Sequence, residues 1–329
     1  MKKAALLFFA LLMLSAPVMA DSPVIVKLSH NLPEDTPQHK GCLKFKELAE
    51  SKSGNDIKVK IFHNQQIGTD QESVELMQTG VIQASLVPTA KLSRFDPTLQ
   101  IADLPFLFPS KEICYCVLDS EAGTKLLAGL EKIGLKGVAV WESGFKQLTA
   151  DRAIRKPEDY KGLKIRVMDS PILVEQFKYM GAKAFPIDFH KVYDALKEGI
   201  VNGQENPLAS ITKMKFYEVQ PHMTLSYHGY LAYAFLFGKT FWDKLDTGQQ
   251  KILKDAATEA AHYERELTAK MEKDFIKTIA DSGTKIIRLT DEERKAFEKA
   301  TRPVHKIFAD TVGKEILEMV YAHIKECGK

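Results

Sequence analysis

The sequence predicts an α/β protein built as two lobes that a long helix joins. Strand and helix patterns alternate along the first part of the chain, which is the order of a parallel sheet with helices on its faces. The length of 329 residues exceeds what one hydrophobic core usually serves. Between Gly248 and Gly283 no residue breaks a helical pattern, and a helix of that length is longer than one lobe is wide.

The first twenty residues, MKKAALLFFALLMLSAPVMA, have the pattern of an export signal. Two lysines precede an apolar run from Ala4 to Leu14, and small residues stand at Val18 and Ala20. Cleavage is expected after Ala20. The run is too short to span a bilayer, which takes about 20 residues, so a retained anchor is disfavoured. We expect an exported chain that begins near Asp21.

After the leader, the pattern is βαβαβ. VIVKLS (24–29) alternates and is β-branched, and a helical stretch follows it and stops at Gly54. IKVKIF (57–62) is predicted as a second strand, DQESVELMQTG as a helix that ends at Gly80, and VIQASLV as a third strand. This order predicts a parallel sheet in the first lobe.

The middle of the chain adds three strands and two helices. GLKGVAVWES, FKQLTAD and KIRVMDS are predicted as strands. SPILVEQFKYMGA is predicted as a helix with Ser170 as its N-cap and Pro171 in its first turn. DFHKVYDALKEG is predicted as a second helix, capped by Asp188 and closed by Gly199.

The long helix carries apolar residues every three or four positions from Ile252 to Ile279. At about 1.5 Å per residue it runs roughly 50 Å, so we expect it to bridge the lobes. The strand KIIRL, a helix from Asp291 and a last amphipathic stretch close the chain. Exported two-lobed α/β proteins often bind ligands between their lobes and close by a hinge.

Four cysteines follow the leader, at positions 42, 114, 116 and 327. Cys114 and Cys116 are one residue too close for the usual Cys-x-x-Cys metal pattern, and on a helix they point to different faces. We expect mostly buried, unpaired thiols. A disulfide with Cys42 or Cys327 stays open, because an exported protein meets oxidising conditions.

The charge balance gives no indication of a nucleic-acid partner. Lysine and arginine number 46 against 43 acidic residues, and loss of Lys2 and Lys3 with the leader brings the net formal charge from +3 to near +1.

Two stretches place polar residues where strands or loops meet helices. Lys146 and Arg166 lie twenty residues apart on neighbouring predicted strands. A strand arginine offers a rigid fork that matches a carboxylate with two parallel hydrogen bonds. In GIVNGQENPLAS, Glu205 and Asn206 precede Pro207, and an asparagine can donate to a carboxylate and accept from a hydroxyl. Together they indicate an anion site between the lobes.

Taken alone, Arg166 is more often a solvated or ion-paired surface residue, and QENP is more often a turn. Five motifs in one order favour the functional interpretation: LPFLF (104–108), KGLKIRV (161–167), VYDAL (192–196), GQENP (203–207) and KFYEVQ (215–220). With them, the chain resembles the solute-binding protein of a tripartite ATP-independent periplasmic (TRAP) transporter, of the DctP family. The resemblance runs from the first strand to the last helices. It implies a periplasmic, two-lobed, type II-like fold with a ligand cleft between the lobes.

The resemblance also implies a site, residue by residue. Arg166 in KGLKIRV would form a bidentate salt bridge with a substrate carboxylate. Asn206 in GQENP would support the same ligand, and Phe189 would line the pocket. On the other lobe, the positions that vary with substrate are His30 or Asn31 after the first strand, Asp70 at a helix start, and Thr89 or Lys91 after the third strand.

One departure within the family bears on the ligand class. Sialic-acid-binding members carry a second arginine twenty residues before the key arginine, whereas this chain has Lys146 and is similar there to C4-dicarboxylate members. At Lys91, sialate binders also carry an arginine with an upstream glutamate, where this chain has Pro88. A second cation beside Arg166 suits a second carboxylate. Malate, succinate or fumarate is therefore expected, while a uronate or a 2-oxo or 2-hydroxy acid stays open.

The resemblance implies delivery of the ligand to a symporter with a small and a large membrane subunit, by a monomer without a cofactor. An extracytoplasmic ligand sensor with the same fold is the alternative, and the sequence does not separate the two. The expected division is a signal peptide at 1–20, lobe I at 21–143 plus 232–271, and lobe II at 144–231 plus 272–329.

No constellation in the sequence supports catalysis. There is no Gly-x-Ser-x-Gly elbow, phosphate loop or dinucleotide fingerprint. His30, Glu34 and His39 lack the spacing of metal ligands on one helical face. Asp188 is explained as an N-cap and His190 as exposed helix surface. We therefore expect a binding protein, neither an enzyme nor a metal protein, and the polar residues at strand ends disfavour a purely structural role.

Overall fold

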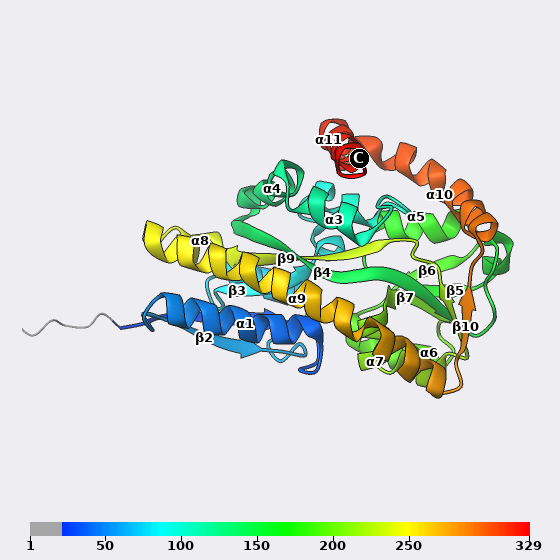
Figure 1. Cartoon of the computed structure of the whole chain (residues 1–329), viewed down its shortest axis with the longest axis horizontal. Coiled ribbons are helices and arrows are strands. Elements are labelled where there is room, and N and C mark those ends of the chain that lie inside the picture. The colour runs from blue at the N-terminus through cyan, green and yellow to red at the C-terminus, as the bar shows by residue number, and fades with distance from the viewer. Residues whose placement is uncertain (1–21) are drawn as a thin grey trace, which may run out of the picture.

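The computed structural model describes residues 22–329. The predicted leader, residues 1–20, lies outside the described residues. The described chain forms two lobes on one mixed sheet with the strand order β2-β1-β3-β9-β4-β7-β5-β6, and helices cover both faces (Figure 1). The predicted α/β fold of two lobes joined by a long helix is confirmed.

Lobe I is built around the predicted βαβαβ unit, with β1 between β2 and β3 and parallel to both. Thr36 caps the first helix, and Thr69 with Glu72 forms a capping box on the second. The elements of this unit are β1 (Val24–His30), α1 (Pro37–Lys52), β2 (Ile57–Phe62), α2 (Asp70–Gln78) and β3 (Ala84–Pro88).

Lobe II is built around β5, which lies between β6 and β7 and is parallel to both. The GQENP segment is not a turn: it forms β7, and all five of its residues are buried. Ser170 lies at the predicted N-cap, but its hydroxyl makes no capping hydrogen bond. The elements are β5 (Lys164–Val167), α5 (Pro171–Tyr179), β6 (Lys183–Pro186), α6 (Val192–Lys197), β7 (Gly203–Pro207) and α7 (Leu208–Lys213).

One long strand runs from lobe I into lobe II. GLKGVAVWES and FKQLTAD were expected as two strands, and the structure corrects this to a single strand, β4 (Leu135–Ala150). Its first part pairs with β9 (Tyr230–Gly238), and from Lys146 onward it pairs with β7. A bulge between Glu142 and Gly144, where Gly144 has a φ of 112°, bends the strand without ending it.

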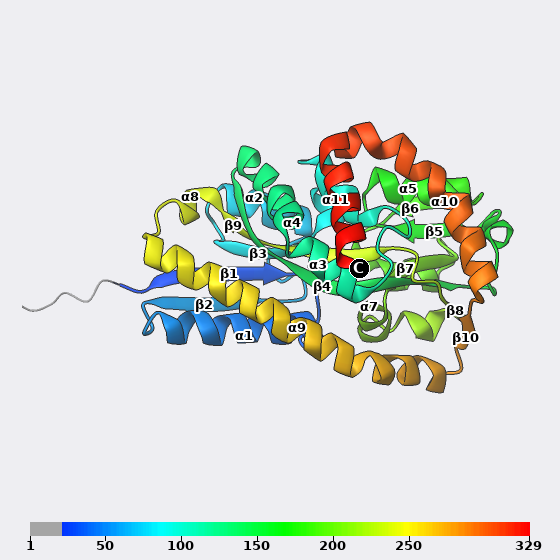
Figure 2. The ribbon, with the colours of Figure 1, turned by 45° about the horizontal axis from the view of Figure 1, so that its top comes forward.

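The predicted long helix is α9 (Thr247–Asp281), which has 35 residues and follows the short α8 (Lys239–Trp242). It packs on α1 and β4 at one end and on α7 at the other (Figures 1 and 2). The Trp141 indole donates to the carbonyl oxygen of Ala257 at 3.0 Å, which fixes the helix on the sheet. A Cβ at Gly41 of α1 would lie 2.7 Å from the Trp141 ring, so only glycine fits at this crossing.

The C-terminal segment lies against both lobes. β10 (Lys285–Arg288) pairs with β8 (His222–Leu225) beside lobe II. α10 (Asp291–Val312) packs on α5 and on residues 97–103, and α11 (Lys314–Cys327) packs on α3 (Lys111–Leu118) and α4 (Glu121–Ala128). The predicted division of the chain between the lobes stays a prediction. None of the helices within residues 22–329 has the length and apolar character that a bilayer crossing requires.

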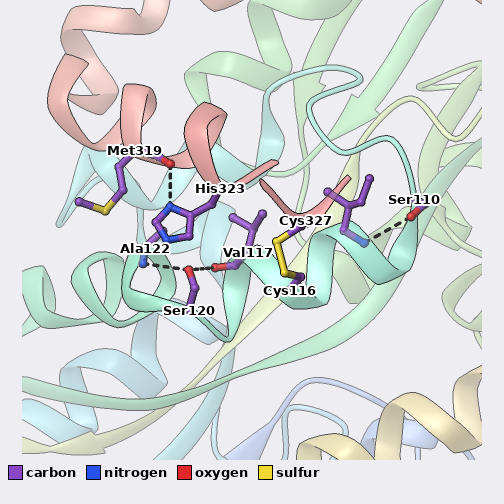
Figure 3. Close-up of a disulfide and its surroundings, with 9 residues drawn as sticks. Ser110, Cys116, Val117, Ser120, Ala122, Met319, His323 and Cys327 are labelled. Atoms are coloured by element: carbon purple, nitrogen blue, oxygen red, sulfur yellow. Dashed lines mark hydrogen bonds between the residues drawn. A yellow bond between two sulfur atoms is a disulfide. The ribbon is translucent and has the colours of Figure 1, made fainter. Parts of the chain in front are cut away.

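A disulfide joins the end of the chain to lobe I. Cys116 of α3 pairs with Cys327 of α11 (Figure 3), while Cys42 and Cys114 are buried and free. The expectation of unpaired thiols is therefore confirmed for the two buried cysteines and wrong for the other pair. Cys114 points into the core and Cys116 away from it, because residues two apart on a helix face in different directions.

We expect Cys327→Ser to lower the free energy of unfolding by about 2 to 4 kcal/mol, because the disulfide restricts a loop that spans 211 residues of the unfolded chain. Denaturation in guanidinium chloride, followed by circular dichroism, measures the change. A reductant is the matched control: it should destabilise the parent protein by a similar amount and leave the variant unchanged. An equal response of both proteins to the reductant would contradict the pairing.

Candidate ligand-binding site

Arg166 is the central feature of the site. It lies in the middle of β5, opposite Phe185 of β6 and Gln204 of β7, and its side chain is 0% exposed. Its Nε donates to the carbonyl oxygen of Ile187 at 2.9 Å, while Nη1 and Nη2 have no hydrogen-bond partner in the described chain. Burial lowers the pKa of Arg166 to about 10, so the guanidinium stays charged at neutral pH. A buried cation with two free donor groups is costly unless an anion pairs with it.

The walls around this guanidinium combine an aromatic ring with carboxylates. The ring of Phe189 has its centroid 6.0 Å from the guanidinium carbon. Glu205, Asp188 and Asp70 lie near enough to raise the pKa of Arg166 against the effect of burial, and so does the buried Tyr233. Asp188 accepts a hydrogen bond from the backbone N–H of His190, which confirms its predicted capping role.

The opposite wall is a hydrogen-bonded network at the carboxyl ends of β1 and β3, the edge where ligands bind in open α/β sheets. Asn31 donates to Asp70 at 3.0 Å and accepts from the hydroxyl of Tyr233 at 3.1 Å. Lys91 pairs with Asp70 at 2.5 Å and lies 3.8 Å from Asp188. Tyr233 could not be singled out from the sequence, because it lies inside the apolar strand β9, where an aromatic residue is ordinary core.

Lys146 lies in a different environment from Arg166. It is 1% exposed and lies 3.2 Å from Asp103 and 3.2 Å from Glu205, which are also buried. Nε2 of His228 lies 3.3 Å from Oε2 of Glu205, an oxygen that Lys146 also contacts. The expectation that Lys146 offers a spare positive charge to a ligand has to be revised, since two protein carboxylates already pair with it.

Burial and the surrounding charges act on these carboxyl groups in opposite directions. Burial raises the pKa of Asp103 to about 6, even though Lys146 opposes the shift. For Glu205, burial alone would raise the pKa, but Lys146 and His228 outweigh it and hold the pKa below its usual value. We infer that Lys146 positions Glu205 beside Arg166 without contacting the ligand itself.

Three other predicted residues are buried with protein partners. Asn206 donates to Gln204 at 2.6 Å, and Thr89 donates to the carbonyl oxygen of Ala232 at 3.4 Å. His30 accepts from the backbone N–H of Leu32 through Nδ1, so its Nε2 donates to Nδ1 of His39 at 3.1 Å. Burial and two neighbouring histidines lower the pKa of His30 to about 3, and the ring is therefore neutral. These three residues are held in place by hydrogen bonds to the protein.

The two lobes meet across the site. Nε2 of His190 lies 2.9 Å from the carbonyl oxygen of Asn31, which corrects the expectation that His190 is exposed helix surface. Gln100 accepts from the backbone N–H of Ile172 at 3.3 Å and from the hydroxyl of Ser170 at 3.4 Å. These contacts hold the cleft closed over Arg166. A hollow of about 330 Å³ lies at the surface beside this place, and it shares Lys91 and Asp188 with the walls described above. Its lining residues are Thr69, Gln71, Lys91, Arg94, Asp169, Pro186, Ile187 and Asp188.

Among residues 22–329, no group of three or more histidine, cysteine, aspartate or glutamate side chains could hold a metal ion. Glu34 pairs with His63 at 3.0 Å, and His30 pairs with His39, so these side chains bond to each other.

Two lobes closed on a buried, unpaired arginine form the arrangement of a solute-binding protein. The family model for bacterial extracellular solute-binding protein, family 7 (DctP), matches residues 28–311, and the chain belongs to this family. The C4-dicarboxylate-binding periplasmic protein DctP of Rhodobacter capsulatus is 37% identical over 320 residues, which cover 96% of this chain and 95% of that one.

Solved structures support the same assignment. The sugar acid binding protein DctPAm from Advenella mimigardefordensis, in complex with galactonate, superposes with a TM-score of 0.89 at 33% identity over 93% of this chain and 99% of that chain. A TRAP periplasmic solute binding protein from Shewanella oneidensis, with bound succinate, gives 0.88 at 33% identity over 92% and 99%. The resemblance seen in the sequence motifs is confirmed at the level of the TRAP solute-binding family.

We expect Lys146→Met to lower the free energy of unfolding by about 3 to 5 kcal/mol, because two buried carboxylates lose their cation. Thermal and urea denaturation measure the loss. Lys183→Met is the control, since Lys183 is exposed and has no ion pair within the described chain, and it should change stability by less than about 0.5 kcal/mol. A Lys146→Met protein of full stability that binds monoacids normally and dicarboxylates weakly would instead restore a direct ligand role for Lys146.

Proposed function

We propose that this chain is the periplasmic component of a TRAP transporter that captures a small organic carboxylate and delivers it to a membrane symporter. The observation that carries the proposal is Arg166: a fully buried guanidinium with Nη1 and Nη2 free of protein partners. Two parallel N–H donors match the two oxygens of a carboxylate. The family membership and the predicted export leader support delivery from outside the cytoplasmic membrane.

Closure follows from where the walls of the site come from. Arg166 and Phe189 belong to lobe II, and Asn31, Asp70 and Lys91 belong to lobe I. A ligand that contacts both lobes binds the closed state more tightly than the open one, so it shifts the population toward closure. A membrane partner that recognises the closed state then receives loaded protein.

For the ligand we propose a C4-dicarboxylate such as succinate, malate or fumarate. The relative from Rhodobacter capsulatus and the succinate-bound structure support this class. We place the second carboxylate at Lys91 in place of Lys146. Both lysines lie near two protein carboxylates, but the side chain of Lys91 is 13% exposed and borders the hollow, whereas that of Lys146 is 1% exposed.

A hydroxylated monoacid is the second candidate, and one observation favours it. The charges of Arg166 and Lys91 are already balanced in number by those of Asp70 and Asp188. Carboxylates and the amide of Asn31 can accept hydrogen bonds from ligand hydroxyls, and the galactonate-bound relative is a sugar-acid binder.

We expect Arg166→Ala to abolish binding of the acid, with a loss of about 3 to 5 kcal/mol in binding free energy, because the ligand carboxylate is left buried without a partner. Titration calorimetry measures the loss. The melting temperature of the free variant shows whether it still folds. Arg155→Ala, at an exposed arginine outside the cleft, is the matched control. Near-normal affinity in Arg166→Ala would refute the site.

We expect Lys91→Met to weaken succinate more than butyrate, because only the diacid places a second carboxylate beside the ammonium group. Calorimetry with both acids at one pH gives the two losses. Equal losses for the two acids would contradict the second subsite, and tighter binding of galactonate than of succinate by the parent protein would favour the hydroxylated monoacid.

A further inference from the structure

We propose that a basic hollow on the C-terminal helices is a docking site for an acidic polypeptide segment. The hollow, here called the α10 hollow, measures about 970 Å³ and lies between α10, α11 and the loop that follows residues 97–103. Figures 1 and 2 show α10 and α11 crossing one side of the molecule above α5 and α3. Its lining residues are Pro105, Phe106, Pro109, Arg294, Lys295, Glu298, Lys299, Arg302, His305 and Tyr321.

Positive charge is concentrated here although the whole chain is nearly balanced. Lys295, Lys299, Arg302 and Lys306 recur every three or four residues, so they share one face of α10. All four are exposed, and none forms an ion pair within the described chain. Arg294 is paired, since its Nε lies 3.1 Å from Glu298.

Lys295 with Lys299 and Arg302 with Lys306 have a spacing of four residues, at which like charges destabilise a helix. Acids stand at the same spacing from three of these cations, but within the described chain they form no ion pair with them: Glu298 pairs with Arg294, and Asp310 pairs with Lys314. Elsewhere in the chain, exposed lysines of helices pair with an acid four residues away. Such pairs are Lys239–Asp243, Lys251–Asp255 and Lys277–Asp281. An acidic partner would remove the repulsion along α10 by supplying the missing negative charge.

The walls of the α10 hollow are fixed in advance. His305 joins three segments: its Nε2 donates to the carbonyl oxygen of Pro105 at 2.7 Å, and its Nδ1 accepts from the hydroxyl of Tyr321 at 2.6 Å. The Cys116–Cys327 disulfide holds the end of α11 on α3 (Figure 3). A preformed recess loses little conformational entropy on binding.

The loop that forms one wall also touches the buried charges behind the ligand site. Phe106 donates its backbone N–H to the carbonyl oxygen of His228 at 2.8 Å, and Asp103 just before the loop pairs with Lys146. α10 contacts α5 of lobe II as well as residues 97–103. A peptide bound in the hollow would therefore lie beside segments of both lobes.

The shape favours a polypeptide segment over a membrane surface. The lining combines aromatic and proline side chains with cations in a recess of about 970 Å³, so a protruding segment can enter it, whereas a flat bilayer cannot. The assignment of this segment to the membrane partner rests on the proposed function, whereas the binding of an acidic peptide does not. Either claim can therefore be refuted without refuting the other.

The test measures binding of fluorescein-labelled hexaglutamate to the purified protein by fluorescence anisotropy, in about 20 mM and about 500 mM salt. The key variant is Lys295→Glu, Lys299→Glu and Arg302→Glu together. The matched control makes the same change in net charge at three exposed lysines outside the hollow, with the substitutions Lys197→Glu, Lys254→Glu and Lys273→Glu. A third variant with glutamine at positions 295, 299 and 302 guards against a folding defect, and vesicles containing phosphatidylglycerol are tested in parallel.

We expect saturable binding at low salt that weakens at high salt, a loss of about tenfold or more in the key variant, and a loss of less than about threefold in the control. The glutamine variant should lie between the two. Equal losses in the key variant and the control would overturn the proposal, because general charge would then explain the binding. Absence of hexaglutamate binding, or vesicle binding that alone depends on these three residues, would also overturn it.

Discussion

The structure depends on one constraint: a charged guanidinium is held in the middle of a sheet with most of its donors unsatisfied by the protein. Arg166 is fixed by strand pairing on both sides and by one hydrogen bond to Ile187, and neither contact neutralises its charge. A stable fold tolerates such a group where a ligand supplies the opposite charge. The surrounding features, from Phe189 to the closing contact of His190 with Asn31, enclose that position and exclude water, which strengthens a charge-assisted bond.

Two buried cations, Arg166 and Lys146, have different roles: we propose that Arg166 binds the ligand and that Lys146 supports the site. Lys146 has two carboxylate partners, whereas the terminal nitrogens of Arg166 have none. Lys146 lies on β4, Glu205 on β7 and Asp103 at the end of the helical segment 97–103, so their ion pairs help to hold β7, which pairs with the strand of Arg166. The chain continues from Asp103 into the loop that lines the α10 hollow, so the buried charges lie between the ligand site and that hollow.

Much of this could be predicted from the sequence. Elements that depend on neighbouring residues alone were predicted correctly. Examples are the alternating strands VIVKLS and IKVKIF and the uninterrupted helical pattern of α9. The errors concern tertiary context. The turn-like sequence GQENP forms a strand because it pairs with β4 on one side and with β5 on the other. The junction near Gly144 is a bulge inside one strand because β9 pairs with β4 on both sides of it. The pairing of Cys116 with Cys327 depends on where α11 packs, which no local pattern shows.

The candidate site divides in the same way. That Arg166 matters could be predicted from its residue type, strand position and motif, but the saturation of Lys146 could not, because Asp103 is distant in sequence and carries no motif. The most direct measurement of the central claim is a crystal structure of the protein with the acid that gives the largest thermal stabilisation. We expect a carboxylate with its oxygens about 2.7 to 2.9 Å from Nη1 and Nη2 of Arg166. A ligand bound elsewhere, or one that presents no anionic group to Arg166, would contradict it.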